Sequence, residues 1–90
     1  MAHFTVYTKT VCSFCTAAKG WMLKHGHTYD ELNVETDPAL MEQMKAKLPR
    51  SRTVPQIYFG DYHIGGYTDL KEAEHNGSLS MLLEDLPKEK

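Results

Sequence analysis

The feature that most constrains this chain is the change of hydrophobic period at its two cysteines, Cys12 and Cys15. Residues 1–8 alternate between two sides and are rich in β-branched and aromatic types, which predicts a strand. From residue 13 to about residue 25 the apolar positions take helical spacing, and Gly26 follows as a stop signal. The cysteine pair therefore lies where a strand ends and a helix begins.

The rest of the chain continues as alternating helices and strands. The expected elements are strands at 28–34, 54–59 and 62–64, and helices at 38–48, 68–76 and 79–86. A βαβ crossover makes the first two strands parallel, and the Gly60-Asp61 turn makes the last two an antiparallel hairpin. The order βαβαββα plus a terminal helix predicts an α/β fold, with a four-stranded mixed sheet flanked by helices.

Length and charge limit what the chain can do. Its 90 residues fit one domain, spanning 1–90. Ten basic against twelve acidic side chains give a formal net charge of −2, without the basic excess that nucleic-acid binding needs. No apolar run approaches the ~18 residues of a membrane span, and the N-terminus lacks the pattern of a signal peptide. We therefore expect a cytoplasmic monomer that binds neither nucleic acid nor membrane.

The position of Cys12 favours a reactive thiolate. The unpaired N–H groups and the dipole of a helix N-terminus stabilise negative charge at that end of the helix. Lys9 lies three residues upstream and adds positive charge, while Cys15 lies one helical turn further on, within reach of the first sulfur. These features predict a redox-active pair.

Two other uses of the cysteine pair fit the residues less well. A structural zinc site needs four ligands, but the chain has no second cysteine pair, and His25 and His27 miss the usual spacing. A purely structural disulfide in so short a loop would remove little conformational entropy from the unfolded chain. The five histidines fall in different expected elements, so we interpret them as surface or turn residues with no catalytic base among them.

Two later segments carry backbone features that can bind a ligand. In Thr53-Val54-Pro55, a cis proline would present the Val54 main chain beside the cysteines for strand-like hydrogen bonds to a peptide. An ordinary trans loop proline is the alternative. In the second segment, Gly65-Gly66-Tyr67-Thr68-Asp69, free amides of the glycine pair could hold a ligand carboxylate while Asp69 holds a ligand ammonium. The alternative there is a turn before a helix with Asp69 as N-cap and Glu72 at N3.

Taken in order, these segments resemble the glutaredoxin family over nearly the full length of the chain. The matching stretches are Val6-Tyr7-Thr8-Lys9 before Cys12-Ser-Phe-Cys15, then Thr53-Val54-Pro55-Gln56-Ile57, then Ile64-Gly65-Gly66-Tyr67-Thr68-Asp69-Leu70. The resemblance implies a thioredoxin fold, a cis peptide bond before Pro55 and glutathione as the reducing partner.

The resemblance also implies a role for each matching residue. Cys12 would be the nucleophile and Cys15 the resolving thiol. The residues implied to bind glutathione are Lys9, Phe14, Thr53, Val54, Pro55, Gly66, Thr68 and Asp69. Within that set, Lys9 is expected to meet a glutathione carboxylate. The Val54 main chain is expected to pair with the cysteinyl unit, and Asp69 to hold the γ-glutamyl end.

Some positions depart from the family's usual pattern. Ser13 and Phe14 stand where relatives commonly have proline and tyrosine, which changes the rigidity of the helix start and removes a phenolic hydroxyl. Tyr67 stands where relatives often have a small residue, so we expect a narrower groove. The candidates for binding the glycine carboxylate of glutathione are Gln43 and Arg52.

The expected function is glutathione-dependent thiol–disulfide exchange, acting on protein disulfides and on glutathionylated proteins. A small thioredoxin-like reductase is one alternative, although Val11 rather than tryptophan precedes Cys12. The other alternative is a carrier or sensor of a 2Fe–2S cluster, held between two protomers by the Cys12 thiolates and two glutathiones. Some glutaredoxins with serine in place of the motif proline bind such a cluster, but this chain has a second cysteine.

Overall fold

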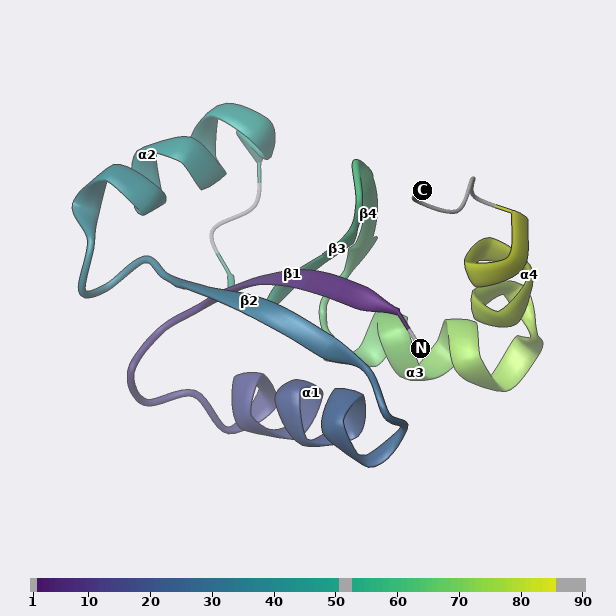
Figure 1. The fold of residues 1–90 in the computed structure, drawn as a ribbon. Coiled ribbons are helices and arrows are strands. Elements are labelled where there is room, and N and C mark those ends of the chain that lie inside the picture. Colours follow the sequence, from purple (N-terminus) through teal and green to yellow (C-terminus); the bar gives the residue numbers. More distant parts are fainter. Residues whose placement is uncertain (1, 51–52, 86–90) are drawn as a thin grey trace.

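The computed structural model describes residues 2–50 and 53–85 of the chain. Its elements are β1 (His3–Thr8), α1 (Ser13–Lys24), β2 (Thr28–Asn33), α2 (Pro38–Lys47), β3 (Gln56–Phe59), β4 (Tyr62–Gly65), α3 (Tyr67–Asn76) and α4 (Ser78–Asp85). They follow the expected order and form the predicted mixed α/β arrangement (Figure 1).

The strands form one four-stranded sheet in the order β2-β1-β3-β4. β1 pairs in parallel with β2 and antiparallel with β3, and β3 pairs antiparallel with β4. The β3–β4 hairpin turns at Gly60, whose φ of 61° lies in the left-handed region that glycine adopts without strain. This turn sets a register in which Tyr58 lies opposite His63.

Helices cover both faces of the sheet, with α1 and α3 on one face and α2 on the other (Figure 1). The side chains of β1 point alternately to the two faces of the sheet, so they contribute to the core on each side. Phe4 and Val6 join the core that α1 and α3 share with the sheet, and Tyr7 joins the core on the α2 side. β1 is therefore packed on both faces just before the chain enters the cysteine loop.

Helix ends follow the expected signals with one exception. α2 begins as predicted, because Asp37 accepts a hydrogen bond from a first-turn amide and Pro38 occupies the first helical position. The predicted start of α3 is wrong. The helix begins at Tyr67 with Gly66 as its N-cap, so Asp69 is the N3 residue rather than the cap. Its carboxylate reaches back to the Gly66 amide and replaces the side chain that glycine lacks.

Some strand limits differ from those expected. β3 begins at Gln56 rather than at residue 54, because Pro55 has no N–H to donate to the neighbouring strand. β2 ends one residue early, and β4 extends one residue further, to Gly65. The expected limits at residues 1 and 86 lie outside the described residues.

A polar contact ties α1 to the sheet. Lys19 Nζ and Thr8 Oγ1 each donate a hydrogen bond to Glu31 Oε2, at 2.8 Å in both cases. The hydrogen bond from Lys19 is the main reason that the pKa of Glu31 lies below its ordinary value. Burial opposes this lowering, and Thr8 adds to it. The helix that carries both cysteines is thus held against β1 and β2 by charge as well as by apolar packing.

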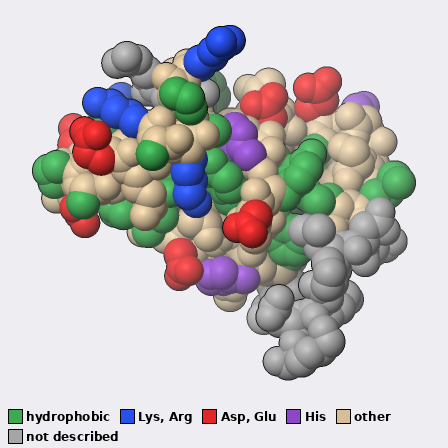
Figure 2. Space-filling model, turned by 90° about the horizontal axis from the view of Figure 1, so that it is seen from above, with side chains coloured by type: hydrophobic (Ala, Val, Ile, Leu, Met, Phe, Trp, Pro, Cys, Tyr) green, Lys and Arg blue, Asp and Glu red, His purple; other side chains and the backbone are tan. Residues whose placement is uncertain are grey.

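The surface seen from above, on the α2 side, carries interspersed acidic and basic side chains over α2 (Figure 2). This distribution agrees with the small formal net charge of −2. In the part of the chain that the structure describes, no helix has both the length and the apolar character needed to cross a membrane.

Candidate active site

Cys12 is the N-cap of α1. Its backbone is extended, with φ −157° and ψ 103°, and its Sγ accepts a hydrogen bond from Cys15 N at 3.1 Å. The first turn of α1 contains no acidic side chain, so nothing in that turn neutralises the positive end of the helix dipole. The Cys12 sulfur therefore occupies the position where a helix best stabilises a thiolate.

The two cysteines differ in their access to solvent. They form a disulfide with a Cα–Cα distance of 5.2 Å. Cys15 is 1% exposed, whereas Cys12 is partly exposed. A substrate sulfur can approach Cys12 far more easily than Cys15, which suits Cys12 as the attacking sulfur and Cys15 as the resolving one.

The loop before β3 brings a second segment of main chain to the cysteines. The Val54–Pro55 bond is cis, as the resemblance implies, so the alternative of a trans loop proline is wrong. Val54 O lies 3.8 Å from Cys12 Sγ. The peptide groups of Val54 are therefore close enough to the sulfur to pair with an extended ligand bound there.

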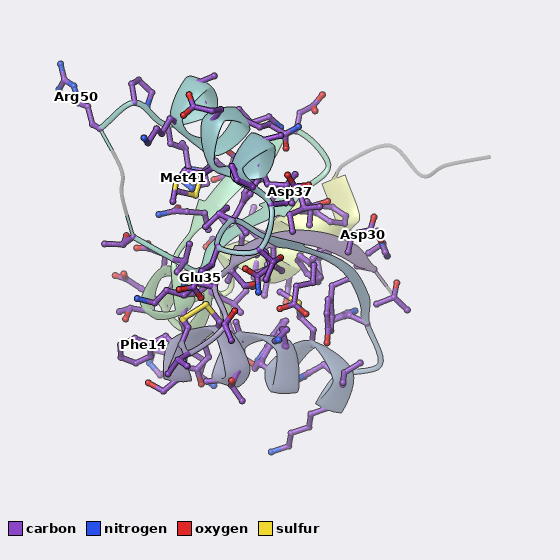
Figure 3. The ribbon with its side chains drawn as sticks, turned by 90° about the vertical axis from the view of Figure 1, so that its left-hand side faces the viewer. Phe14, Asp30, Glu35, Asp37, Met41 and Arg50 are labelled. Carbon is purple, nitrogen blue, oxygen red and sulfur yellow. A yellow bond between two sulfur atoms is a disulfide. The ribbon has the colours of Figure 1, made fainter. Side chains whose placement is uncertain are left out.

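A groove of about 370 Å³ extends from the start of α1 to the start of α3. Its lining consists of Phe14, Thr53, Val54, Pro55, Gln56, His63, Gly65, Gly66, Tyr67, Thr68 and Asp69. Phe14 lies beside the disulfide on the first turn of α1 (Figure 3) and is 59% exposed. Its ring stacks on Tyr67, with the centroids 6.1 Å apart. The two stacked rings line one side of the groove and form a contact between α1 and α3.

The start of α3 places a carboxylate in the groove. Asp69 Oδ2 accepts a hydrogen bond from Gly66 N at 2.9 Å, so this amide is not free for a ligand as the sequence suggested. Among the described residues no hydrogen bond engages Asp69 Oδ1, which leaves it as an acceptor for a ligand cation. Gly65 has a φ of 120°, and a Cβ atom built there would overlap the Asp69 carboxylate.

Sequence reasoning missed a chain of polar groups along the groove. Gln56 Nε2 donates to Thr53 O at 2.9 Å, and Gln56 Oε1 lies 2.7 Å from His63 Nε2. Burial lowers the pKa of His63, and the charge of Asp69 partly opposes this effect. The hairpin register could have indicated the contact, because it sets His63 opposite Tyr58, two residues from Gln56. His63 is exposed on β4, in agreement with the interpretation of the histidines as surface or turn residues, but its hydrogen bond to the buried Gln56 was not predicted.

Two further histidines cluster at the other end of α1. His25 stacks on Trp21 with ring centroids 4.5 Å apart, and His27 lies 5.5 Å from the same ring. His27 Nδ1 also accepts a hydrogen bond from Ala2 N at 2.9 Å. Burial is the main cause that lowers the pKa of His27, followed by the charges of the N-terminus and of His25. These contacts join the end of α1 to the start of β1, away from the cysteines.

Lys9 and Gln43, two of the side chains predicted to bind a glutathione carboxylate, lie outside the groove lining. Lys9 is exposed, and its positive charge helps to keep the pKa of Glu35 low. The main cause of that lowering is a hydrogen bond that Thr10 N, in the cysteine loop, donates to Glu35 Oε1 at 2.9 Å. Gln43 is exposed on α2 and accepts a hydrogen bond from the hydroxyl of Tyr7. Arg52 lies outside the described residues.

The site therefore supplies sulfur chemistry together with groups that bind a peptide. Its parts are an accessible sulfur, a main-chain segment beside it and a carboxylate further along the groove. Among the described residues, no group of three or more His, Cys, Asp or Glu side chains is placed to hold a metal ion.

Sequence comparisons agree with this chemistry. The family model for glutaredoxin matches residues 4–64 of the chain. The chain belongs to the glutaredoxin family. It is 38% identical over 84 residues to a glutaredoxin of Neisseria meningitidis serogroup A, which covers 92% of this chain and 98% of that protein. It is 37% identical over 83 residues to glutaredoxin 3 of Escherichia coli K12, covering 92% and 99%.

Solved glutaredoxin structures share the fold. The holo form of glutaredoxin C1 from Populus tremula x tremuloides gives a TM-score of 0.78 at 26% identity, covering 93% of this chain and 85% of that one. A buckwheat glutaredoxin–glutathione complex gives 0.77 at 28% identity, covering 91% and 76%. The predicted thioredoxin fold is thus confirmed, and the chain is a thiol–disulfide oxidoreductase of the glutaredoxin family.

Proposed function

We propose that this glutaredoxin uses glutathione as electron donor to reduce protein disulfides and glutathione mixed disulfides. One observation carries the proposal: a single groove runs from Val54, whose carbonyl lies beside Cys12 Sγ, to the carboxylate of Asp69. Glutathione is a zwitterionic tripeptide with a central thiol, so it needs main-chain partners beside a reactive sulfur and an acceptor for its ammonium group. The groove offers both, and the buckwheat glutaredoxin–glutathione complex supports the choice of ligand.

In this binding mode the tripeptide lies along the groove with its sulfur at Cys12. The Val54 main chain pairs with the cysteinyl unit, and Phe14 packs against the peptide. Asp69 accepts the ammonium group on its Oδ1 atom, with Thr68 beside it. The exposed Lys9, next to the cysteine loop, meets the carboxylate at the other end of the tripeptide.

Reduction of a glutathione mixed disulfide needs only Cys12. Its thiolate attacks the glutathione sulfur, a new S–S bond forms to that sulfur, and the substrate sulfur leaves as a thiolate. A second glutathione thiolate then attacks the glutathione sulfur held on Cys12. This step releases oxidised glutathione and restores the Cys12 thiolate.

Reduction of a protein disulfide can use both cysteines. Cys12 attacks one substrate sulfur and forms a mixed disulfide with the protein. Cys15 then attacks the Cys12 sulfur, which frees the reduced substrate and leaves the Cys12–Cys15 disulfide seen in the structure. Two glutathione molecules return this disulfide to two thiols and leave as oxidised glutathione.

The test is glutathione-coupled turnover of a small glutathionylated disulfide by the wild type, Cys12→Ser and Cys15→Ser. We expect activity in the wild type and in Cys15→Ser, and none in Cys12→Ser. Absence of glutathione-dependent turnover in the wild type would contradict the proposal.

The same variants separate the two routes when a protein disulfide is the substrate. Cys15→Ser should lose most of this second activity while it keeps the first, because only the mixed disulfide with a protein requires Cys15. Equal loss of both activities in Cys15→Ser would make the buried thiol obligatory for every substrate.

A further inference from the structure

The hydrogen-bond chain from His63 to Thr53 defines the protonation of the histidine. Thr53 O is a carbonyl and can only accept, so the Gln56 side chain must direct its NH₂ group toward it. Its oxygen Oε1 then faces His63 Nε2 at 2.7 Å, and an oxygen of this kind can only accept. Consequently His63 Nε2 carries a proton, in the neutral ring as well as in the imidazolium.

Gln56 is well placed to transmit this constraint. The residue is 5% exposed, so its side chain has little access to water that could replace either partner. A second hydrogen bond joins Gln56 Nε2 to Thr53 Oγ1 at 3.3 Å. The amide thus grips both the main chain and the side chain of Thr53, while His63 fixes the amide from the other side.

Thr53 O and Val54 N belong to the same planar peptide group. In a trans peptide the C=O and N–H bonds point in opposite directions, so fixing the direction of Thr53 O also fixes that of Val54 N–H. The Val54 main chain lines the groove and lies next to Cys12 Sγ. Any rotation of this peptide would turn the donor with which an extended ligand pairs.

We propose that His63 is a positioning residue for glutathione, holding the Thr53–Val54 peptide in its binding orientation through Gln56. The inference rests on the proposed function, because it assigns His63 to the binding of that ligand. His63 itself comes from β4, where its ring packs against Tyr58 with centroids 4.9 Å apart, and the charged group that faces it from α3 is Asp69.

The first test measures KM and kcat for a small glutathionylated disulfide in His63→Phe and His63→Gln. Phenylalanine keeps a ring against Tyr58 but cannot donate, and glutamine carries an NH₂ group at the position of the histidine Nε2. We expect His63→Phe to raise KM about fivefold, the worth of one hydrogen bond, with kcat within about twofold of the wild type. In His63→Gln, KM should fall most of the way back to the wild-type value. The matched control is His75→Phe, an exposed position near the end of α3.

The outcomes separate this proposal from the proposed function. If the wild type turns over with glutathione but KM is the same in His63→Phe, His63 has no positioning role while the function stands. A rise in KM that His63→Gln does not reverse would also overturn the proposal. A wild type without glutathione-dependent turnover would remove the function itself.

A second test does not depend on turnover or on a variant that folds. ¹⁵N-edited NMR of the reduced wild type at neutral pH distinguishes the two neutral tautomers of His63. We expect the proton on Nε2, because Gln56 Oε1 requires a donor there. A proton on Nδ1 alone would overturn the hydrogen-bond chain on which the proposal stands.

Discussion

The starts of α1 and α3 meet at the same groove but are capped in opposite ways. α1 has no acidic side chain in its first turn, and the Cys12 sulfur receives the hydrogen bond from the helix amide. α3 has Asp69 in its first turn, and this carboxylate receives the hydrogen bond from Gly66 N. Both helices present positive N-terminal ends. The two helices differ in the anion at this end. At α1 it is a thiolate, which forms and is consumed during the reaction, and at α3 it is a carboxylate that stays charged.

The difference shows how the positive end of a helix can be used in two ways. At α1 the helix end has no acidic side chain of its own. It is therefore free to stabilise the thiolate of Cys12, which lowers the free energy needed to deprotonate that cysteine. At α3 the same positive end is already balanced by Asp69, so the carboxylate is fixed in place as an acceptor. One helix start thus offers a place for a thiolate, and the other offers a fixed carboxylate acceptor.

The largest expected effect comes from Cys12→Ser. Serine is a good N-cap, so α1 should keep its start and the reduced protein should unfold within about 0.5 kcal/mol of the reduced wild type. Turnover of a glutathionylated substrate should fall at least about a thousandfold, because a serine hydroxyl stays protonated near neutral pH. The measurement is steady-state turnover beside urea unfolding. A variant that retains a tenth of the activity would show that another group attacks.

The next largest effect is expected from Gly65→Ala, on the free energy of unfolding. Gly66→Ala is the control variant. A methyl group at residue 65 would overlap the Asp69 carboxylate, and the φ of 120° is unfavourable for alanine. We expect a loss of about 2 kcal/mol in the free energy of unfolding, together with weaker binding of glutathione. At residue 66 the added carbon would meet Pro55 O at 3.6 Å, an ordinary contact, so that variant should lose much less. Equal unfolding midpoints in urea for the two variants would contradict this assignment.

Asp69→Asn removes the charge at the start of α3 while keeping an oxygen that can accept from Gly66 N. We expect KM for a glutathionylated substrate to rise about tenfold, because the ammonium group loses its ionic partner. kcat should change little, since the thiolate is at the other helix. Asp61→Asn, in the β3–β4 turn, is the control. An unchanged KM in Asp69→Asn would place the ammonium group elsewhere.

The smallest expected effect is on the free energy of unfolding, and it comes from the contact between Glu31 and the middle of α1. Glu31 has a lowered pKa in the folded protein, so its contribution to stability is present above the ordinary value and is lost as the pH falls through the folded value. Glu31→Gln should cost roughly 0.5 kcal/mol at neutral pH and nothing in strong acid, because the Lys19 pair is partly exposed. Urea unfolding at several pH values measures this. Substrate turnover should stay unchanged, and a loss of turnover would mean that the Glu31 contact also shapes the cysteine site.

The order of elements and the placement of the cysteines could be predicted because their signals are local. Alternation in residues 1–8, the stop at Gly26 and the Asp37-Pro38 helix start each act within a few residues of the structure they determine. The start of α3 could not be predicted in this way. Gly66 and Asp69 can each serve as a cap, and only the folded chain shows that Asp69 reaches back to its own helix start.

The binding side of the groove depends on contacts between elements. The isomer before Pro55 followed from the resemblance, since the residues alone favour the trans form. The link from His63 to Gln56 crosses between β4 and β3, so it depends on the strand register rather than on any local pattern. The cysteine site was therefore easier to predict from the sequence than the contacts between elements that line the groove.

The cluster around Trp21 gives the protein a built-in optical probe. Trp21 is the single tryptophan of the sequence and is 7% exposed. It lies six residues beyond Cys15 on α1, about 9 Å along the helix axis. Its emission therefore reports on the end of α1 that packs against His25 and His27, not on the sulfur atoms. Fluorescence will follow unfolding in the oxidised and the reduced protein with one common signal, which allows the stability of the two redox forms to be compared directly.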